Sequence, residues 1–139
     1  MLDEAPGRWF RGKYNTAKDA GDALVYYHAK LDAYANFGVD IREMNHAIVV
    51  SGGKIPDPYG LRDHLRALCD RLESAIKDAC WTRRDLLFWG MARARGRSIK
   101  EIAKQEHTAQ DTIKEALERV DRRLDDLLCA RGMMTRRIQ

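Results

Sequence analysis

The sequence predicts an all-α protein, with a long antiparallel helix pair at its N-terminal end and a unit of three helices at its C-terminal end. Apolar residues recur at steps of three and four over long stretches, which is the spacing of one buried helix face. Residues that can cap helices precede several of these stretches. No apolar–polar alternation is long enough for a strand. The 139 residues, 45% of them hydrophobic, fit one domain or two small ones.

The first long helix is expected to begin at about Thr16, whose side chain can cap it, with Asp19 three residues later. Gly38 is the expected C-terminal stop. One apolar stripe runs along this helix and consists of Ala20, Leu24, Tyr27, Leu31 and Tyr34. The preceding aromatic segment around Trp9 and Phe10 lacks periodicity, and we expect it to be an extended arm or a short packed turn.

Residues 39–60 are expected to be the longest non-helical stretch, because glycine and proline residues cluster there. Within it, Ser51-Gly52-Gly53-Lys54 lacks the spacing of a phosphate-binding loop and is interpreted as a turn. A second long helix follows, and its apolar stripe can be buried against that of the first. The members of this stripe are Leu61, Leu65, Leu68, Leu72, Ile76 and Ala79.

Three further helices are expected between residues 82 and 128. Thr82 can cap the first of them. Ser98 can cap the second, and Glu101 three residues later completes a capping box. A turn at residues 106–108 leads to the third helix, which is the longest of the three. This helix is expected from about Ala109 to Leu128, with an inner stripe of Ile113, Leu117, Val120, Leu124, Leu127 and Leu128.

The chain lacks the patterns that mark membrane, metal and enzyme sites. No run of about 18 apolar residues is present, and the first residues lack the features of a signal peptide, so a cytoplasmic protein without membrane contact is expected. The three cysteines form no CxxC pair and are expected to be reduced core residues; they are Cys69, Cys80 and Cys129. The histidines lack ligand spacing along one helix, and no nucleophile elbow or carboxylate pair stands out, so no metal, cofactor or enzymatic activity is expected. Trp81 and Trp89 are expected to pack in the core.

Basic residues are concentrated in the C-terminal part of the chain. Residues 81–139 contain 14 basic and 9 acidic residues, whereas residues 1–80 contain 11 and 12, within a formal net charge of +4. This asymmetry indicates a polyanionic partner for the C-terminal part. We therefore divide the chain into an N-terminal interaction or scaffold region, 1–80, and a C-terminal functional region, 81–139.

The two helices that follow Ser98 have the proportions of a helix-turn-helix, because a short helix and a long one are joined by about three residues. The small Ala103 lets the second helix cross the first closely. The turn needs a residue that tolerates a positive φ, and His107 is expected to adopt that conformation.

Several short motifs of this region match a known family. They are Ser98-Ile99-Lys100-Glu101-Ile102-Ala103-Lys104-Gln105, Thr112-Ile113-Lys114, Arg119, Arg122-Arg123-Leu124 and Leu127-Leu128. With these motifs, residues 84–128 resemble the DNA-binding region of sigma-70-type factors, which reads the −35 promoter element. Ala109 stands where that family commonly has a Ser or Thr cap. In size and in the order of its parts, the whole chain is similar to phage late-gene regulators of the ArpU and RinA type.

The resemblance implies double-stranded DNA as a partner, with the first turns of the last helix in the major groove. Side chains expected to reach base edges are Gln110, Asp111, Lys114 and Glu115. Side chains expected to contact phosphates are Arg97, Lys100, Arg119, Arg122 and Arg123, together with the helix N-terminus at Ser98.

Three functions remain open at this point. The first is a sequence-specific transcription regulator, a phage late-gene activator or antiterminator that acts with host RNA polymerase. The second is a sigma-mimicking protein that binds RNA polymerase without DNA contact, and the third is a phage terminase small subunit. The N-terminal helices can serve as a scaffold, a homodimer interface or a polymerase-binding surface, and they carry an aromatic flank typical of interfaces. This flank consists of Tyr14, Tyr26, Tyr27 and Tyr34.

Overall fold

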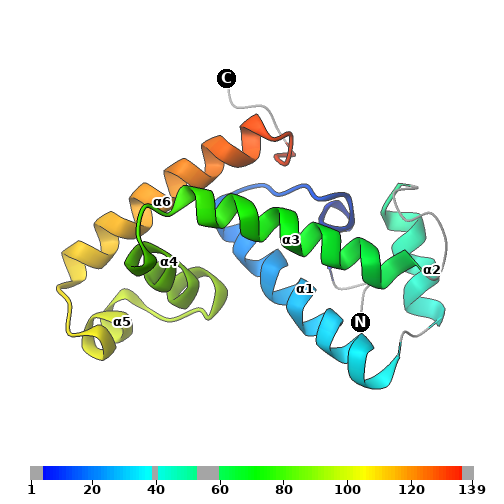
Figure 1. Ribbon diagram of the computed structural model, residues 1–139, viewed down its shortest axis with the longest axis horizontal. Coiled ribbons are helices and arrows are strands. Elements are labelled where there is room, and N and C mark those ends of the chain that lie inside the picture. Colours follow the sequence, from blue (N-terminus) through cyan, green and yellow to red (C-terminus); the bar gives the residue numbers. More distant parts are fainter. Residues whose placement is uncertain (1–4, 39–40, 53–59, 136–139) are drawn as a thin grey trace.

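The computed structural model describes residues 5–38, 41–52 and 60–135, and this part of the chain is all-helical, as predicted (Figure 1). It contains no strand beyond one isolated bridge between Tyr14 and Met134. None of its helices has the length and apolarity needed to cross a bilayer. The α-helices are α1 (Ala17–Phe37), α2 (Ile41–Val50), α3 (Leu61–Ala79), α4 (Arg83–Trp89), α5 (Ile99–Glu106) and α6 (Gln110–Ala130). A 3-10 helix, η2 (Gly7–Arg11), precedes α1, and a π-helical segment, η4 (Gly90–Ala94), continues α4.

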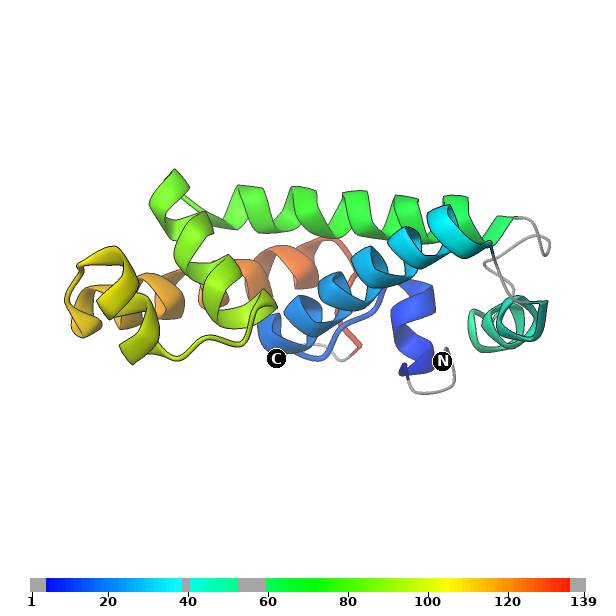
Figure 2. The same ribbon diagram turned by 90° about the horizontal axis from the view of Figure 1, so that it is seen from below.

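The two long helices α1 and α3 run in opposite directions and pack along each other (Figures 1 and 2). α1 begins where its cap predicts, since the Thr16 hydroxyl accepts a hydrogen bond from the Asp19 N–H at 3.1 Å. It ends before Gly38, which has a φ of 76°. All six stripe residues of α3 are buried, whereas Leu24 and Leu31 of the α1 stripe are half-buried. The apolar stripe of α3 is therefore the more completely buried of the two.

Helix α2 contradicts the prediction of a non-helical stretch over residues 39–60. Met44 and Ala47 are buried on it, three residues apart, and the helix packs against η2. A helix of this length offers too few turns for its period to stand out among consecutive apolar residues, so its packing partner decides the conformation. The proline-containing part of the expected loop, residues 53–59, lies outside the described residues.

The aromatic segment before α1 is a packed turn held by the carboxylate of Asp19. Arg8 Nη2 donates to this carboxylate at 2.7 Å, Trp9 Nε1 at 3.2 Å and the Asn15 N–H at 2.9 Å. Burial raises the pKa of Asp19, but the hydrogen bonds outweigh burial and hold the pKa below its ordinary value. Phe10 is fully buried beside these contacts. Of the two expectations for this segment, the short packed turn is the one found.

Residues from both sides of the expected boundary at residue 80 share one hydrophobic core. Helix α6 packs against α1, α3, α4 and α5. The Asp125 carboxylate accepts a hydrogen bond from the Ala17 N–H at 3.0 Å, which ties α6 to the start of α1. The chain end returns to the N-terminal segment, where the Tyr14 N–H donates to the Met133 carbonyl at 2.8 Å. The boundary is thus a corner between α3 and α4 rather than a linker between independent cores.

Gly21 is a position where α1 closely approaches the backbone of η4. A Cβ atom there would lie 3.1 Å from Arg93 Cβ and 3.2 Å from the Arg93 carbonyl oxygen. We expect Gly21→Val to lower the free energy of unfolding by about 2 kcal/mol in urea denaturation, because it overpacks this contact. The matched control is Gly90→Ala, where a Cβ would meet nothing within 4 Å and φ is −60°. The control should stabilise the protein by about 0.5 kcal/mol, and equal losses in both variants would contradict the packing argument.

Asp19 is expected to make the protein sensitive to acid. Because its pKa is lowered in the folded state, its contacts stabilise the protein above about pH 4, and this stabilisation is lost as the pH falls through the lowered pKa. Asp19→Asn cannot ionise, so the free energy of unfolding of the variant should fall less than that of the unsubstituted protein between about pH 6 and about pH 2.5. Parallel curves for the two proteins in urea denaturation would exclude this role.

Candidate nucleic-acid interface

Helix α5 begins with the predicted capping box. Ser98 Oγ accepts a hydrogen bond from the Glu101 N–H at 3.1 Å, and Glu101 Oε1 accepts one from the Ser98 N–H at 3.2 Å. The backbone hydrogen bond from Ser98 lowers the pKa of Glu101 below its usual value. Ile102 is fully buried, and Ile99 and Ala103 are half-buried on the same side. α5 is therefore a short, firmly started helix that lies against α6.

Residues 107–109 connect α5 to α6 through one left-handed residue. His107 has φ 50° and ψ 44°, which confirms the predicted positive φ. The N–H groups of His107 and Thr108 both donate to the Ala103 carbonyl, the second at 3.1 Å, and so complete the end of α5. Ala109 precedes α6 in an extended conformation and gives no side-chain cap. α5 and the first turns of α6 together form one end of the elongated molecule (Figures 1 and 2).

The first two turns of α6 present the four residues expected to read bases. All four are exposed, and their side chains form no hydrogen bond or ion pair with other described residues; they are Gln110, Asp111, Lys114 and Glu115. Ile113 and Leu117 are buried on the opposite side of the helix, with 0% and 3% exposure. The side chains at this tip of α6 are therefore accessible to a partner.

Three of the residues expected to contact phosphates are exposed, namely Arg97, Lys100 and Arg122. Arg97 Nη1 donates to Gln105 Oε1 at 3.0 Å, which places its guanidinium along α5. Lys104, which the sequence analysis did not select, is exposed one turn after Lys100. The N–H of Ser98 already donates to Glu101 in the capping box, so this group is not available to a phosphate.

The two other arginines are engaged within the protein. Arg119 Nη2 donates to the buried Asp85 carboxylate at 2.7 Å, and the second oxygen of that carboxylate accepts the Trp81 N–H at 3.2 Å. Arg123 donates from Nε and Nη2 to the last two carbonyls of α3, at 3.0 and 3.2 Å. These bonds satisfy helix-end carbonyls that have no partner within α3. Arg119 and Arg123 thus fix the packing of α3, α4 and α6, and their expected role as phosphate contacts is not supported by this placement.

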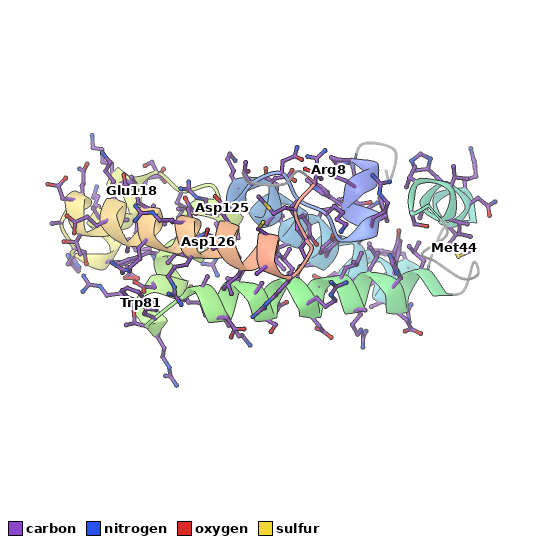
Figure 3. All side chains as sticks on the ribbon, turned by 90° about the horizontal axis from the view of Figure 1, so that it is seen from above. Arg8, Met44, Trp81, Glu118, Asp125 and Asp126 are labelled. Atoms are coloured by element: carbon purple, nitrogen blue, oxygen red, sulfur yellow. The ribbon has the colours of Figure 1, made fainter. Side chains whose placement is uncertain are left out.

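Trp81 is exposed, which corrects the expectation that it packs in the core. Its exposure is 63%, and the Cζ atoms of Arg119 and Arg123 lie 5.1 and 5.0 Å from its ring centroid. Figure 3 shows its side chain at the edge of the molecule. In one continuous helix Trp81 and Trp89, which are eight residues apart, would lie on one face. The helix is interrupted between α3 and α4, so the two side chains do not share a face. Trp89 itself is buried, as expected.

Acidic side chains lie on the outer face of α6. Asp111, Glu115 and Glu118 are exposed at steps of four and three residues, and Figure 3 labels Glu118. The sequence analysis did not select Glu118, although its spacing from Glu115 indicates a shared face. The exposed basic residues Lys100 and Lys104 belong to α5. This end of the molecule therefore combines two exposed lysines of α5, a helix that also carries Glu101 and Glu106, with an acidic outer face of α6.

The ion pair between Asp85 and Arg119 is expected to stabilise the corner between α3 and α4. Asp85→Ala should lower the free energy of unfolding by about 3 kcal/mol in urea denaturation, because it leaves a partly buried guanidinium without its counter-charge. Arg119 Nε is already buried without a hydrogen-bond partner among the described residues. Combining Asp85→Ala with Arg119→Met should recover at least half of the loss, since the unpaired charge is removed. A double variant as unstable as Asp85→Ala alone would show that the pair is not the cause.

Comparisons with known proteins assign no function to this end of the molecule. No protein-family model, no curated protein and no solved structure matches the chain. The functional conclusion therefore rests on the motifs of the sequence and on the placement of its side chains.

Proposed function

We propose that the protein is a sequence-specific DNA-binding transcription regulator that uses α5, residues 107–109 and α6 as a sigma-like helix-turn-helix. The observation that carries this proposal is the accessible polar tip of α6. Gln110 and Lys114 face solvent there, while Ile113 is buried beneath them. A capped short helix and a left-handed residue hold the tip at the end of the molecule. This is the form of a helix that inserts its N-terminal turns into the major groove.

The side chains at the tip have the chemistry for reading base edges. The Gln110 amide can pair in a bidentate manner with adenine, and Lys114 can donate to guanine. Asp111 or Glu115 can accept a hydrogen bond from the amino group of cytosine. Their free side chains support these roles, because no internal hydrogen bond has to be broken before a base is bound.

The phosphate contacts in this proposal come from Arg97, Lys100, Lys104 and Arg122. Four such contacts predict that the logarithm of the affinity changes with the logarithm of the salt concentration with a slope of about −3.6. This dependence corresponds to a loss of affinity of about 150-fold between about 50 and about 200 mM salt. The surface of α1 and α3 would then be available to RNA polymerase, as expected of an activator or antiterminator.

A second function, binding of RNA polymerase without DNA contact, is favoured by the charge on α6. The carboxylates of Asp111, Glu115 and Glu118 repel phosphates and suit a basic protein surface. Trp81 and Leu87 are exposed on or beside α4, with 63% and 46% exposure, and aromatic and apolar side chains of this kind anchor protein interfaces. In this alternative the protein occupies the polymerase site of a sigma domain.

Selection of duplexes from a random pool by the full chain tests the first function. Fluorescence anisotropy with the enriched duplex should then show the salt dependence given by four phosphate contacts. Lys114→Ala should relax the preference at one base pair, with a loss of about 1–3 kcal/mol of discrimination. Arg122→Ala should weaken binding to all duplexes alike and reduce the magnitude of the salt slope by about 1.

Arg66→Ala is the matched control, because Arg66 is an exposed basic residue of α3. This variant should bind like the unsubstituted protein. If no duplex is enriched and the immobilised chain retains RNA polymerase in the absence of DNA, the second function holds instead. An enriched duplex whose affinity is indifferent to both Lys114→Ala and Arg122→Ala would refute the proposed interface.

A further inference from the structure

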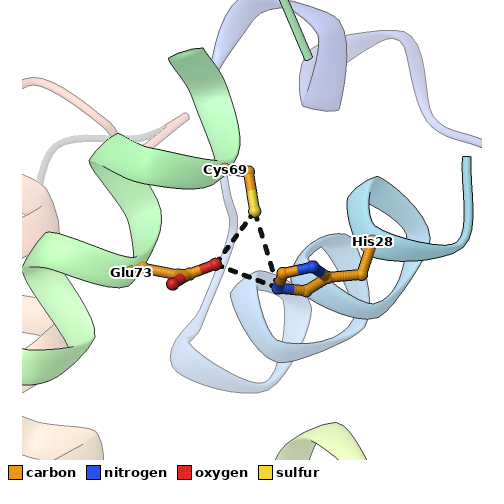
Figure 4. A group of neighbouring side chains, drawn as sticks. All are labelled: His28, Cys69 and Glu73. Carbon is orange, nitrogen blue, oxygen red and sulfur yellow. Dashed lines mark hydrogen bonds and ion pairs between the residues drawn. The ribbon is translucent and has the colours of Figure 1, made fainter. Parts of the chain in front are cut away.

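Three side chains of metal-ligating types converge between α1 and α3. His28 Nε2 lies 2.9 Å from Glu73 Oε1 and 3.6 Å from Cys69 Sγ, and Cys69 Sγ lies 3.1 Å from Glu73 Oε1 (Figure 4). The expectation of no metal site considered histidine spacing along single helices. Here one histidine of α1 meets a thiol and a carboxylate of α3, a juxtaposition that only the packing of the two helices creates.

The three donor atoms are spaced almost as on one face of a zinc tetrahedron. Zinc bonds of about 2.3 Å to sulfur and about 2.0–2.2 Å to nitrogen and oxygen give tetrahedral edges of about 3.4–3.6 Å. The sulfur–nitrogen distance of 3.6 Å already has this length. The two distances to Glu73 Oε1 must each open by about 0.5 Å. The Glu73 side chain is 36% exposed, so its carboxylate has room to make this shift.

The cluster combines a rigid, buried side with an open one. Cys69 and Glu73 are four residues apart on α3, so the helix holds both on one face. Cys69 is buried, whereas the His28 side chain is 56% exposed. Three protein ligands with access to solvent leave a fourth position for water, as in zinc sites that are not purely structural.

The same geometry does not suit a cysteine nucleophile. Glu73 and Cys69 meet the same ring nitrogen of His28, whereas a catalytic relay needs the carboxylate on the other nitrogen. Burial, together with the hydrogen bond to Glu73, raises the pKa of Cys69 to about 12. The thiol is therefore protonated at neutral pH and is a poor nucleophile.

We infer that His28, Cys69 and Glu73 form a binding site for a divalent cation of the zinc type, which ties α1 to α3. Thiolate and imidazole ligands together favour zinc over the hard cations calcium and magnesium. This inference uses none of the residues of the DNA-binding proposal, so each can fail without the other.

Titration of the full chain with Co²⁺, followed by displacement with Zn²⁺, tests the site. We expect a thiolate-to-cobalt charge-transfer band that saturates at one ion per chain, and a higher melting temperature with Zn²⁺. His28→Gln and Cys69→Ser should each weaken Co²⁺ binding at least about 100-fold. Loss of a residue that only hydrogen-bonds to a metal ligand already weakens metal binding by about 10- to 100-fold, and loss of a ligand should cost more. His28→Gln changes an exposed position, so this variant is expected to remain folded.

Two variants outside the cluster serve as matched controls. His107→Asn replaces an exposed histidine by a residue that tolerates its left-handed backbone, and Cys129→Ser removes a half-buried thiol of α6. Both should bind Co²⁺ like the unsubstituted protein. Absence of the charge-transfer band, or its persistence in His28→Gln or Cys69→Ser, would overturn the inference.

Discussion

The burial of one face of α6 is the constraint on which the rest of the molecule depends. Helix α6 packs against α5, α4, α3 and α1, so one helix connects the N-terminal and C-terminal parts of the fold. Each fully buried Ile, Leu or Val side chain stabilises the fold by about 1.5–3 kcal/mol. The buried face consists of Ile113, Ala116, Leu117, Val120, Leu124 and Leu128. Because this face is fixed, the side chains on the opposite face have to meet solvent or a partner.

Carboxylates then set the rotation of α4 against α6. Asp121 accepts a hydrogen bond from Trp89 Nε1 at 3.0 Å and forms an ion pair with Arg93. Asp85 of α4 likewise forms an ion pair with Arg119 of α6. The π-helical segment η4 adds a residue to the turn after Trp89, and Met91 of this segment is buried in the core. The backbone of η4 packs against α1. These directed contacts select one packing where apolar burial by itself would allow several.

The division of basic residues between fold and surface has a functional consequence. Arg119 and Arg123 form internal hydrogen bonds at the corner around Trp81, so the charge asymmetry of the sequence overstates the positive charge available on the surface. Exposed basic side chains remain on α5, at the tip of α6 and outside both, as at Arg97 and Arg122. A regulator with the proposed interface would take its phosphate contacts from residues outside this corner, such as Lys100 and Lys104. The thiol, imidazole and carboxylate between α1 and α3 lie on elements that do not contribute to this tip.

The sequence by itself determined what depends on nearby residues. Long stripes and caps located α1, α3, α5 and α6, and the turn chemistry placed His107 in the left-handed region, because these signals arise within one or two helical turns. The tertiary structure decided the conformation of short segments and the partners of long side chains. It made residues 41–50 a helix, exposed Trp81, engaged Arg119 and brought His28 to α3. Such pairings join residues 34 to 45 positions apart, as in the contacts of Arg119, Arg123 and His28, and a periodic pattern along one helix carries no information about them.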